Sequence, residues 1–173
     1  MKHIFYHLAA VMVVVVWGMT FISTKVLIVH GLSPQEIFLF RFLLAYAAVC
    51  PISFHRFFAR NLKDELYLVG GGVLGGSLFF FLQNIALGLT QASNVSFIIC
   101  MAPLLTAVLT VLSVRTEKVS RGFIYGSIIA LLGVGLLIFN GSFILRISPL
   151  GDLLTLLASL SWAFYSLVIR SLT

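Results

Sequence analysis

The sequence predicts an all-α integral membrane protein with six transmembrane helices, and three observations lead to this prediction. Of the 173 residues, 61% are hydrophobic and 9% are charged, whereas an ordinary soluble domain has about 25% charged residues. This is too little charged surface to cover a water-soluble core, so a soluble enzyme is excluded and a lipid bilayer is the expected partner. The apolar residues also form runs long enough to cross a bilayer, and most charged residues fall between these runs.

The cations are in excess, with 11 Lys+Arg against 5 Asp+Glu and a formal net charge of +6 at pH 7. In a soluble protein, such an excess would suggest a nucleic-acid partner. Here the cations lie mostly in short gaps between apolar runs, where their ordinary role is to orient the helices in the membrane. No nucleic-acid partner is therefore expected.

Three of the first four helices follow from runs that lack formal charge, because a crossing needs about 20 apolar residues. The first such run is 4–24. The second helix carries Arg41 inside it and is assigned because 38–51 is otherwise almost wholly apolar. The run 66–114 is long enough for two crossings, and the polar residues 90–94 separate them.

The last two helices are bounded by turn residues. The run 122–145 contains the fifth helix, which is expected to end near 140–142, and the sixth begins after the turn residues 149–152. The helices are therefore expected at 4–29, 34–54, 66–89, 92–113, 121–139 and 151–170.

Six crossings place both ends of the chain on the same side of the membrane. Most of the loop and terminal cations fall on that side, and the opposite loops hold only Arg146. Because positive residues that flank spans stay in the cytoplasm, the N-terminus is predicted to be cytoplasmic, in a plasma or inner membrane. The cations on that side are Lys2, Arg56, Arg60, Lys63, Arg115, Lys118, Arg121 and Arg170.

The first and sixth helices resemble each other. An offset of 145 residues places Trp17 over Trp162 and Lys25 over Arg170. Five helices separate the two copies, and an odd number reverses the direction of the chain in the membrane, so the second copy would be inverted. We therefore expect one five-helix repeat over 1–145 and the first helix of an incomplete second repeat over 146–173. Because two complete repeats would need about 290 residues, the chain is expected to be a fragment, a truncated gene product, or a half that pairs with a second half-transporter or a second copy.

The order and spacing of several short motifs resemble the EamA-type family of the drug/metabolite transporter superfamily. The resemblance implies ten helices in two inverted five-helix repeats and the export of amino acids or other small metabolites. The sequence departs from the family pattern at Thr116, where the family often has Gly, and by lacking four of the ten helices. The motifs are Trp17–Phe21 with Lys25, Ser33–Pro34, Arg41–Phe42, Ala86–Leu87 through Ala92 to Pro103–Leu104, Glu117–Ser120, and Gly151–Leu154 to Ser161–Ala163.

Polar residues inside the spans are the candidates for substrate binding, because a polar side chain in hydrocarbon is costly without a role. We expect them to converge on a water-accessible cavity at one depth, with Lys25 and Arg41 attracting the anionic end of a small substrate and Trp17 as an aromatic wall. The alternative is that Lys25 reaches the headgroups, Arg41 pairs with Glu36, and the amides join helices. The predicted substrate-binding residues are Trp17, Thr20, Thr24, Lys25, Arg41, Gln83, Asn84 and Asn94.

Small residues and a proline indicate where helices pack closely or bend. Gly72 and Gly76 are four residues apart on one helical face, which lets two helix backbones approach each other. Gly18 and Pro103 are expected to interrupt their helices near the middle of the membrane, either as bending points during transport or as fixed kinks.

Neither a proton-coupled exporter nor an enzyme is favoured. No carboxylate lies near the middle of a predicted span, so this segment lacks the acid that a proton antiporter commonly uses. His3 and His7 are four residues apart without the Glu of a zinc-protease motif, and no phosphate-binding loop occurs. No catalytic residue, metal or cofactor is expected.

The predicted function is therefore a multi-pass transporter, an exporter of small polar or anionic metabolites such as amino acids, that works by alternating access. The first alternative is a truncated half, or an assembly component of the membrane, that transports nothing. A second alternative is a transporter of sugar phosphates or nucleotide sugars, because two cations inside the membrane would suit phosphorylated solutes.

Overall fold

The computed structural model of the chain describes residues 2–53, 59, 61–113, 120–139, 148–170 and 172, and it is all-helical across them. Helices lie at all six expected places, and the chain is an integral membrane protein. Five stretches of the described residues are long and apolar enough to cross a bilayer, and the apolar helix Arg121–Gly133 is shorter. The five are Ile4–Val29, Pro34–Ser53, Leu62–Leu89, Ala92–Ser113 and Pro149–Arg170.

The first two helices, α1 (Lys2–Val29) and α2 (Pro34–Ser53), form a hairpin whose turn is determined locally. Gly31 has a φ of +100°, a left-handed conformation that glycine adopts without steric cost, and it ends α1. A capping box begins α2, because Glu36 accepts hydrogen bonds from the backbone N–H and the hydroxyl of Ser33, both at 2.8 Å. The Ser33 hydroxyl in turn accepts a bond of 3.2 Å from the Glu36 N–H.

The third expected helix is continuous but has three parts, α3 (Leu62–Gly71), the π-helix η1 (Gly72–Leu78) and α4 (Phe79–Leu89). A π-helix departs from the regular hydrogen-bond ladder of an α-helix and often lies at a functional site. Here the Leu74 carbonyl also accepts a hydrogen bond of 2.8 Å from the hydroxyl of Ser161, on a distant helix. The irregular segment is therefore supported from outside its own helix.

The fourth helix is divided into α5 (Ala92–Ile99) and α6 (Ala102–Ser113). The break lies at Cys100 and Met101, just before Pro103, which is the residue where the sequence analysis expected an interruption. Proline has no N–H and its ring clashes with the preceding turn, which explains the break. The Ile98 carbonyl next to the break accepts a hydrogen bond of 3.4 Å from the Ser159 hydroxyl. In contrast, α1 runs unbroken through Gly18, so the expected interruption at that residue is absent.

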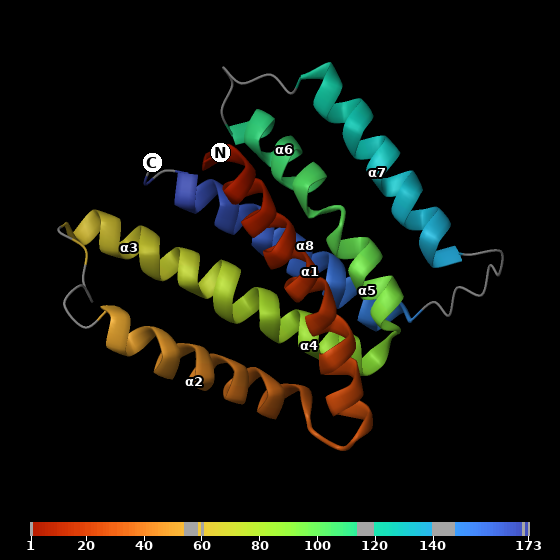
Figure 1. Cartoon of the computed structure of the whole chain (residues 1–173), viewed down its shortest axis with the longest axis horizontal. Helices are drawn as coiled ribbons and strands as arrows, with labels where there is room; N and C mark the ends of the chain where they lie inside the picture. Colours follow the sequence, from red (N-terminus) through yellow and green to blue (C-terminus); the bar gives the residue numbers. More distant parts are fainter. Residues whose placement is uncertain are drawn as a thin grey trace.

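The last two helices are α7 (Arg121–Phe139) and α8 (Pro149–Arg170). Helix α8 occupies the centre of the bundle, where it packs against α3, η1 and α4 on one side and against α5 and α6 on the other (Figure 1). Helices α2 and α7 lie at opposite outer edges. The start of α1 and the end of α8 lie at the same end of the bundle, and the two helices run in opposite directions (Figure 1).

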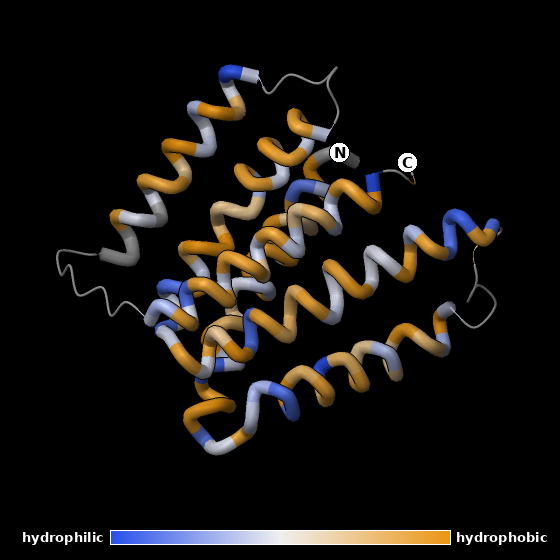
Figure 2. Tube along the Cα trace, turned by 180° about the vertical axis from the view of Figure 1, so that it is seen from behind, coloured by the Kyte–Doolittle hydropathy of each residue, from blue (hydrophilic) through white to orange (hydrophobic). Residues whose placement is uncertain are grey.

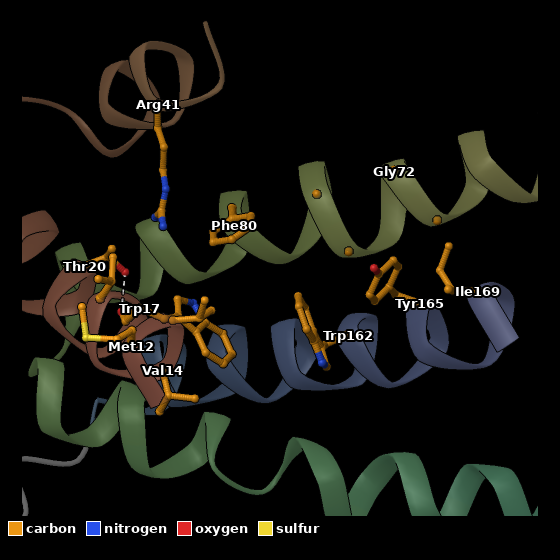
Figure 3. Close-up of a pocket in the computed structure, with 15 residues that line it drawn as sticks. Met12, Val14, Trp17, Thr20, Arg41, Gly72, Phe80, Trp162, Tyr165 and Ile169 are labelled. Carbon is orange, nitrogen blue, oxygen red and sulfur yellow. Dashed lines mark hydrogen bonds between the residues drawn. The ribbon is translucent and has the colours of Figure 1, made fainter. Parts of the chain in front are cut away.

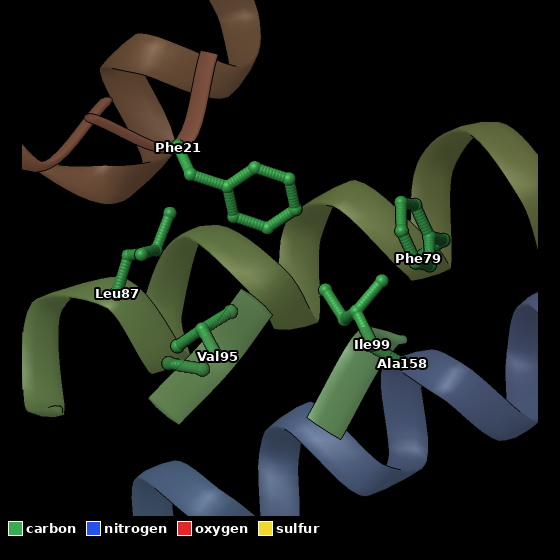
Figure 4. Packing of buried hydrophobic residues seen from close by; sticks show 7 residues of the cluster. Phe21, Phe79, Leu87, Val95, Ile99 and Ala158 are labelled. Atoms are coloured by element: carbon green, nitrogen blue, oxygen red, sulfur yellow. The ribbon is translucent and has the colours of Figure 1, made fainter. Parts of the chain in front are cut away.

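The buried core is small and lies where α1, α4, α5 and α8 meet (Figure 4). Most of the helix length is hydrophobic on the outside as well, with hydrophilic residues concentrated towards helix ends and turns (Figure 2). Such an exterior has lipid as its natural solvent. The core consists of Phe21, Phe79, Ala86, Leu87, Val95, Ile99 and Ala158.

Candidate functional site

A pocket of about 1000 Å³ lies between α1, α2, α8 and the segment formed by α3, η1 and α4 (Figure 3). Each of these elements contributes part of its lining. The side chains come from Met12, Val13, Val14, Val16, Trp17, Thr20, Arg41, Phe80, Trp162, Tyr165 and Ile169, and the glycines are Gly71, Gly72, Gly75 and Gly76.

Aromatic rings form one wall of the pocket. Trp17 of α1 stacks on Trp162 of α8, with ring centroids 5.7 Å apart and an interplanar angle of 29°. The Trp162 ring also lies 5.1 Å from Tyr165. Behind both tryptophans, the core residue Phe79 lies 6.5 Å from Trp17 and 4.9 Å from Trp162. This network fixes the orientation of the rings that face the pocket.

The guanidinium of Arg41 reaches from α2 into the pocket and lies over the ring of Phe80, 4.5 Å from its centroid (Figure 3). Among the residues that the structure describes, no carboxylate lies within ion-pair distance of Arg41. Glu36, the partner expected in the alternative interpretation, is instead bound to Ser33 in the capping box. A half-buried cation within a membrane span therefore faces an apolar pocket without an acidic partner in the described structure.

Four further residues from the sequence analysis meet Arg41 at this pocket: Trp17, Thr20, Gly72 and Gly76. The Thr20 hydroxyl is already used, since it donates to the Trp17 carbonyl at 2.6 Å. Of the two glycines, Gly76 has room for ordinary contact with a neighbouring ring, and Gly72 has nothing within 4 Å of the position that a Cβ would take.

Lys25 does not line the pocket. Its ammonium donates hydrogen bonds to the carbonyls of Leu87, at 2.6 Å, and Thr90, at 2.8 Å, at the C-terminal end of α4. A cation is favourable at this end of a helix because the last carbonyls carry partial negative charge. Asn94 donates to the Thr90 hydroxyl, which donates to Asp152 at 3.5 Å.

Thr24, Gln83 and Asn84 are buried outside the pocket lining. Both amide atoms of Gln83 and the amide oxygen of Asn84 have no hydrogen-bond partner among the described residues. The amide nitrogen of Asn84 donates to the Pro34 carbonyl at 3.5 Å. Buried amide groups are normally hydrogen-bonded. The unpaired amide atoms of Gln83 and Asn84 are therefore an exception within α4.

The aromatic residues Phe80, Trp162 and Tyr165 were missed as site residues by the sequence analysis. The repeat alignment had already matched Trp162 with Trp17, and that signal was sufficient to find it. Nothing in the apolar pattern of the sequence distinguished Phe80 or Tyr165 from the many other aromatic residues. Pro103 lies outside the pocket lining, at the break between α5 and α6.

Within the described part of the chain, no group of three or more His, Cys, Asp or Glu residues is placed to hold a metal ion. The loop residues Arg56, Arg60, Arg115, Glu117, Lys118 and Arg146 lie outside the described residues. The predicted orientation of the chain therefore stays a prediction.

Comparison with known proteins gives two matches. The model of the EamA-like transporter family matches residues 4–139. The uncharacterized transporter YcxC of Bacillus subtilis (strain 168) is 28% identical over 172 residues, which cover 96% of this chain and 54% of that protein. The chain thus spans about half the length of this relative. No solved structure matches the chain.

Proposed function

Because the chain belongs to the EamA-like transporter family, we propose that it forms part of a membrane transporter for small metabolites and that the pocket between α1, α2, η1 and α8 receives the substrate. The family match covers the helices that build most of this pocket. The remaining wall comes from α8, which follows the matched region.

The observation that carries the proposal is the environment of Arg41. A guanidinium held within a membrane span is costly unless an anion or a polar group compensates its charge. In the described structure its contact is the face of an aromatic ring, and the pocket in front of it is open. The carboxylate of a small metabolite, such as an amino acid, would supply the missing charge.

Alternating access between two opposed repeats is the proposed mechanism. Trp17 and Trp162, which the offset of 145 residues makes equivalent, stack on each other across antiparallel helices. Equivalent residues meet in this way when a two-fold axis passes between them. We therefore propose that residues 1–145 form one repeat and that 146–173 begin an inverted second repeat. The rest of that repeat would come from further chain or from a partner. The N-terminus would lie in the cytoplasm, and the transporter would take its substrate from the cytoplasm and release it outside the cell.

The proposal is tested by solute flux into proteoliposomes. One preparation contains this chain alone, and a second contains the chain joined to the second half of the Bacillus relative. Counterflow of labelled amino acids in the second preparation supports transport. Its loss in Arg41→Gln, but not in the control Arg121→Gln, assigns Arg41 to substrate binding.

Absence of flux from both preparations, with correctly inserted protein, would favour the non-transporting alternative. Stronger competition by sugar phosphates than by amino acids would instead favour the transport of phosphorylated solutes. Equal flux with Arg41→Gln and the unaltered chain would refute the role of Arg41.

A further inference from the structure

We propose that the pocket is selective for an organic monoanion with a bulky apolar body, bound with its carboxylate at Arg41 and its body along the aromatic wall. This inference rests on the proposed function and narrows its substrate class. Large apolar carboxylates are then preferred over small polar solutes and sugar phosphates, which the sequence alone left open as substrates.

The charge of the ligand follows from the charge of the pocket. Arg41 is the one formally charged side chain among the described residues that line it. A guanidinium binds one carboxylate through two parallel hydrogen bonds, which satisfies both groups. The second cation predicted for this site, Lys25, is engaged by two carbonyls at the end of α4. A phosphate with two negative charges would therefore lack a second cation.

The polarity of the ligand body follows from the remaining lining. Apart from Arg41, the described side chains are apolar or aromatic, and their polar groups are the hydroxyls of Thr20 and Tyr165 and the indole N–H groups of Trp17 and Trp162. The Thr20 hydroxyl already donates to a backbone carbonyl. A sugar or another polyhydroxylated body would leave several hydroxyls without partners, and each unpaired group weakens binding. An apolar body meets no such penalty and gains from leaving water.

The expected size of the ligand's apolar part follows from the glycines that line the pocket. A Cβ at Gly72 would have no atom within 4 Å, so the backbone of η1 faces open space there. The volume of about 1000 Å³ lies at the upper end of the range for pockets that hold small ligands. A small solute such as propionate would contact little of this surface. A ring or a branched chain would lie between Gly72 and the two tryptophans, because Gly71 and Gly75 are already covered by Ile169 and Tyr165.

Both tryptophans of the chain line the pocket, which makes their fluorescence a direct probe of occupancy. We would titrate the whole chain, in nanodiscs of phosphatidylcholine, with bromophenylpropionate, whose bromine quenches tryptophan on contact. The neutral amide of the same acid is the matched control ligand. Simple partition into lipid favours the neutral amide, so stronger quenching by the anion identifies binding at a charged site.

We expect saturable quenching by the carboxylate, with at least tenfold higher affinity than for the amide. Arg41→Gln should remove this preference, and Arg121→Gln, at the exposed start of α7, should keep it. Equal affinities for acid and amide in the unaltered chain would overturn the proposal. Displacement of the carboxylate by phosphatidylglycerol would identify a lipid as the occupant, and tighter competition by a hexose phosphate would also refute the proposal.

A second pair of variants tests the apolar body without touching the charge. Gly72→Leu fills the pocket from a position where the added side chain meets no neighbour, and Gly126→Leu makes the same change on α7, where a Cβ is equally free. We expect Gly72→Leu to weaken bromophenylpropionate binding at least fivefold and Gly126→Leu to leave it unchanged. Unchanged binding by Gly72→Leu would contradict the placement of the body. These titrations measure binding of one ligand, whereas the proposed function is tested by solute flux. If the titrations fail while another solute is transported, the ligand class is wrong and the proposed function still stands.

Discussion

Substitution of Gly75 by alanine is expected to loosen the contact between η1 and α8. A Cβ at this glycine would lie 2.5 Å from two ring carbons of Tyr165 and 2.9 Å from a third, well inside the ordinary contact distance. These carbons lie at the base of the ring, so rotation of the ring about the Cβ–Cγ bond leaves the clash in place. Either the two helices separate by several tenths of an ångström or more, or Tyr165 leaves its rotamer, and both responses are costly. Overpacking of this kind costs about 1–3 kcal/mol.

The matched control is Gly72→Ala in the same π-helix, where the new methyl group meets nothing within 4 Å. Both substitutions gain the same intrinsic helix propensity, about 1 kcal/mol, so their difference isolates the steric cost at Gly75. Gly71→Ala should fall between them, because its closest neighbour is the flexible end of the Ile169 side chain, at 2.8 Å. The assay is reversible unfolding of the purified chain in mixed micelles, followed by far-ultraviolet circular dichroism.

We expect Gly75→Ala to be less stable than Gly72→Ala by about 1–3 kcal/mol. Adding Tyr165→Ala to Gly75→Ala should remove the clash, so the two changes should couple in a double-mutant cycle. Equal stability of the two glycine variants, or strictly additive effects with Tyr165→Ala, would show that α8 does not pack closely on η1.

Two further predictions concern hydrogen bonds between helices. Lys25→Met should lower the unfolding free energy by about 1–3 kcal/mol, because it leaves two carbonyls at the end of α4 unpaired. Unchanged stability together with a loss of flux would instead place Lys25 in the substrate path, as the sequence suggested. Ser161→Ala should cost about 0.5–1.5 kcal/mol, because the Leu74 carbonyl of η1 loses a donor from another helix but keeps the bond from the Phe79 N–H. Ser166→Ala removes a bond within α8 itself and should cost clearly less in the same unfolding assay, and equal losses would contradict the bridging role of Ser161.

The helices could be located from the sequence because the relevant quantities are local. The length of an apolar run and the positions of charges decide whether a segment crosses a bilayer, and neither depends on the rest of the fold. The capping box at Ser33 and Glu36 and the turn at Gly31 are similarly local. The break before Pro103 also has a local cause, since proline cannot continue the hydrogen-bond ladder.

The site was harder to predict because membrane depth can be counted along a helix, whereas the direction in which a side chain points cannot. Thr20 and Arg41 line the pocket, but Lys25 and Gln83, chosen by the same argument from polarity and depth, do not. The rotation of each helix about its own axis decides this difference. That rotation is set by contacts with neighbouring helices, which an apolar sequence hardly specifies.

The amino-acid sequence by itself determined that the chain lies in a membrane and, to within a few residues, where its helices lie. Only the tertiary structure decided that α1 and α8 stack through their tryptophans, that η1 is a π-helix bonded to α8, and which cation faces the pocket. The physical reason is that hydropathy and helix length are sums over neighbouring residues. A hydrogen bond or a pocket requires residues far apart in the chain to meet, and only the packing of helices brings them together.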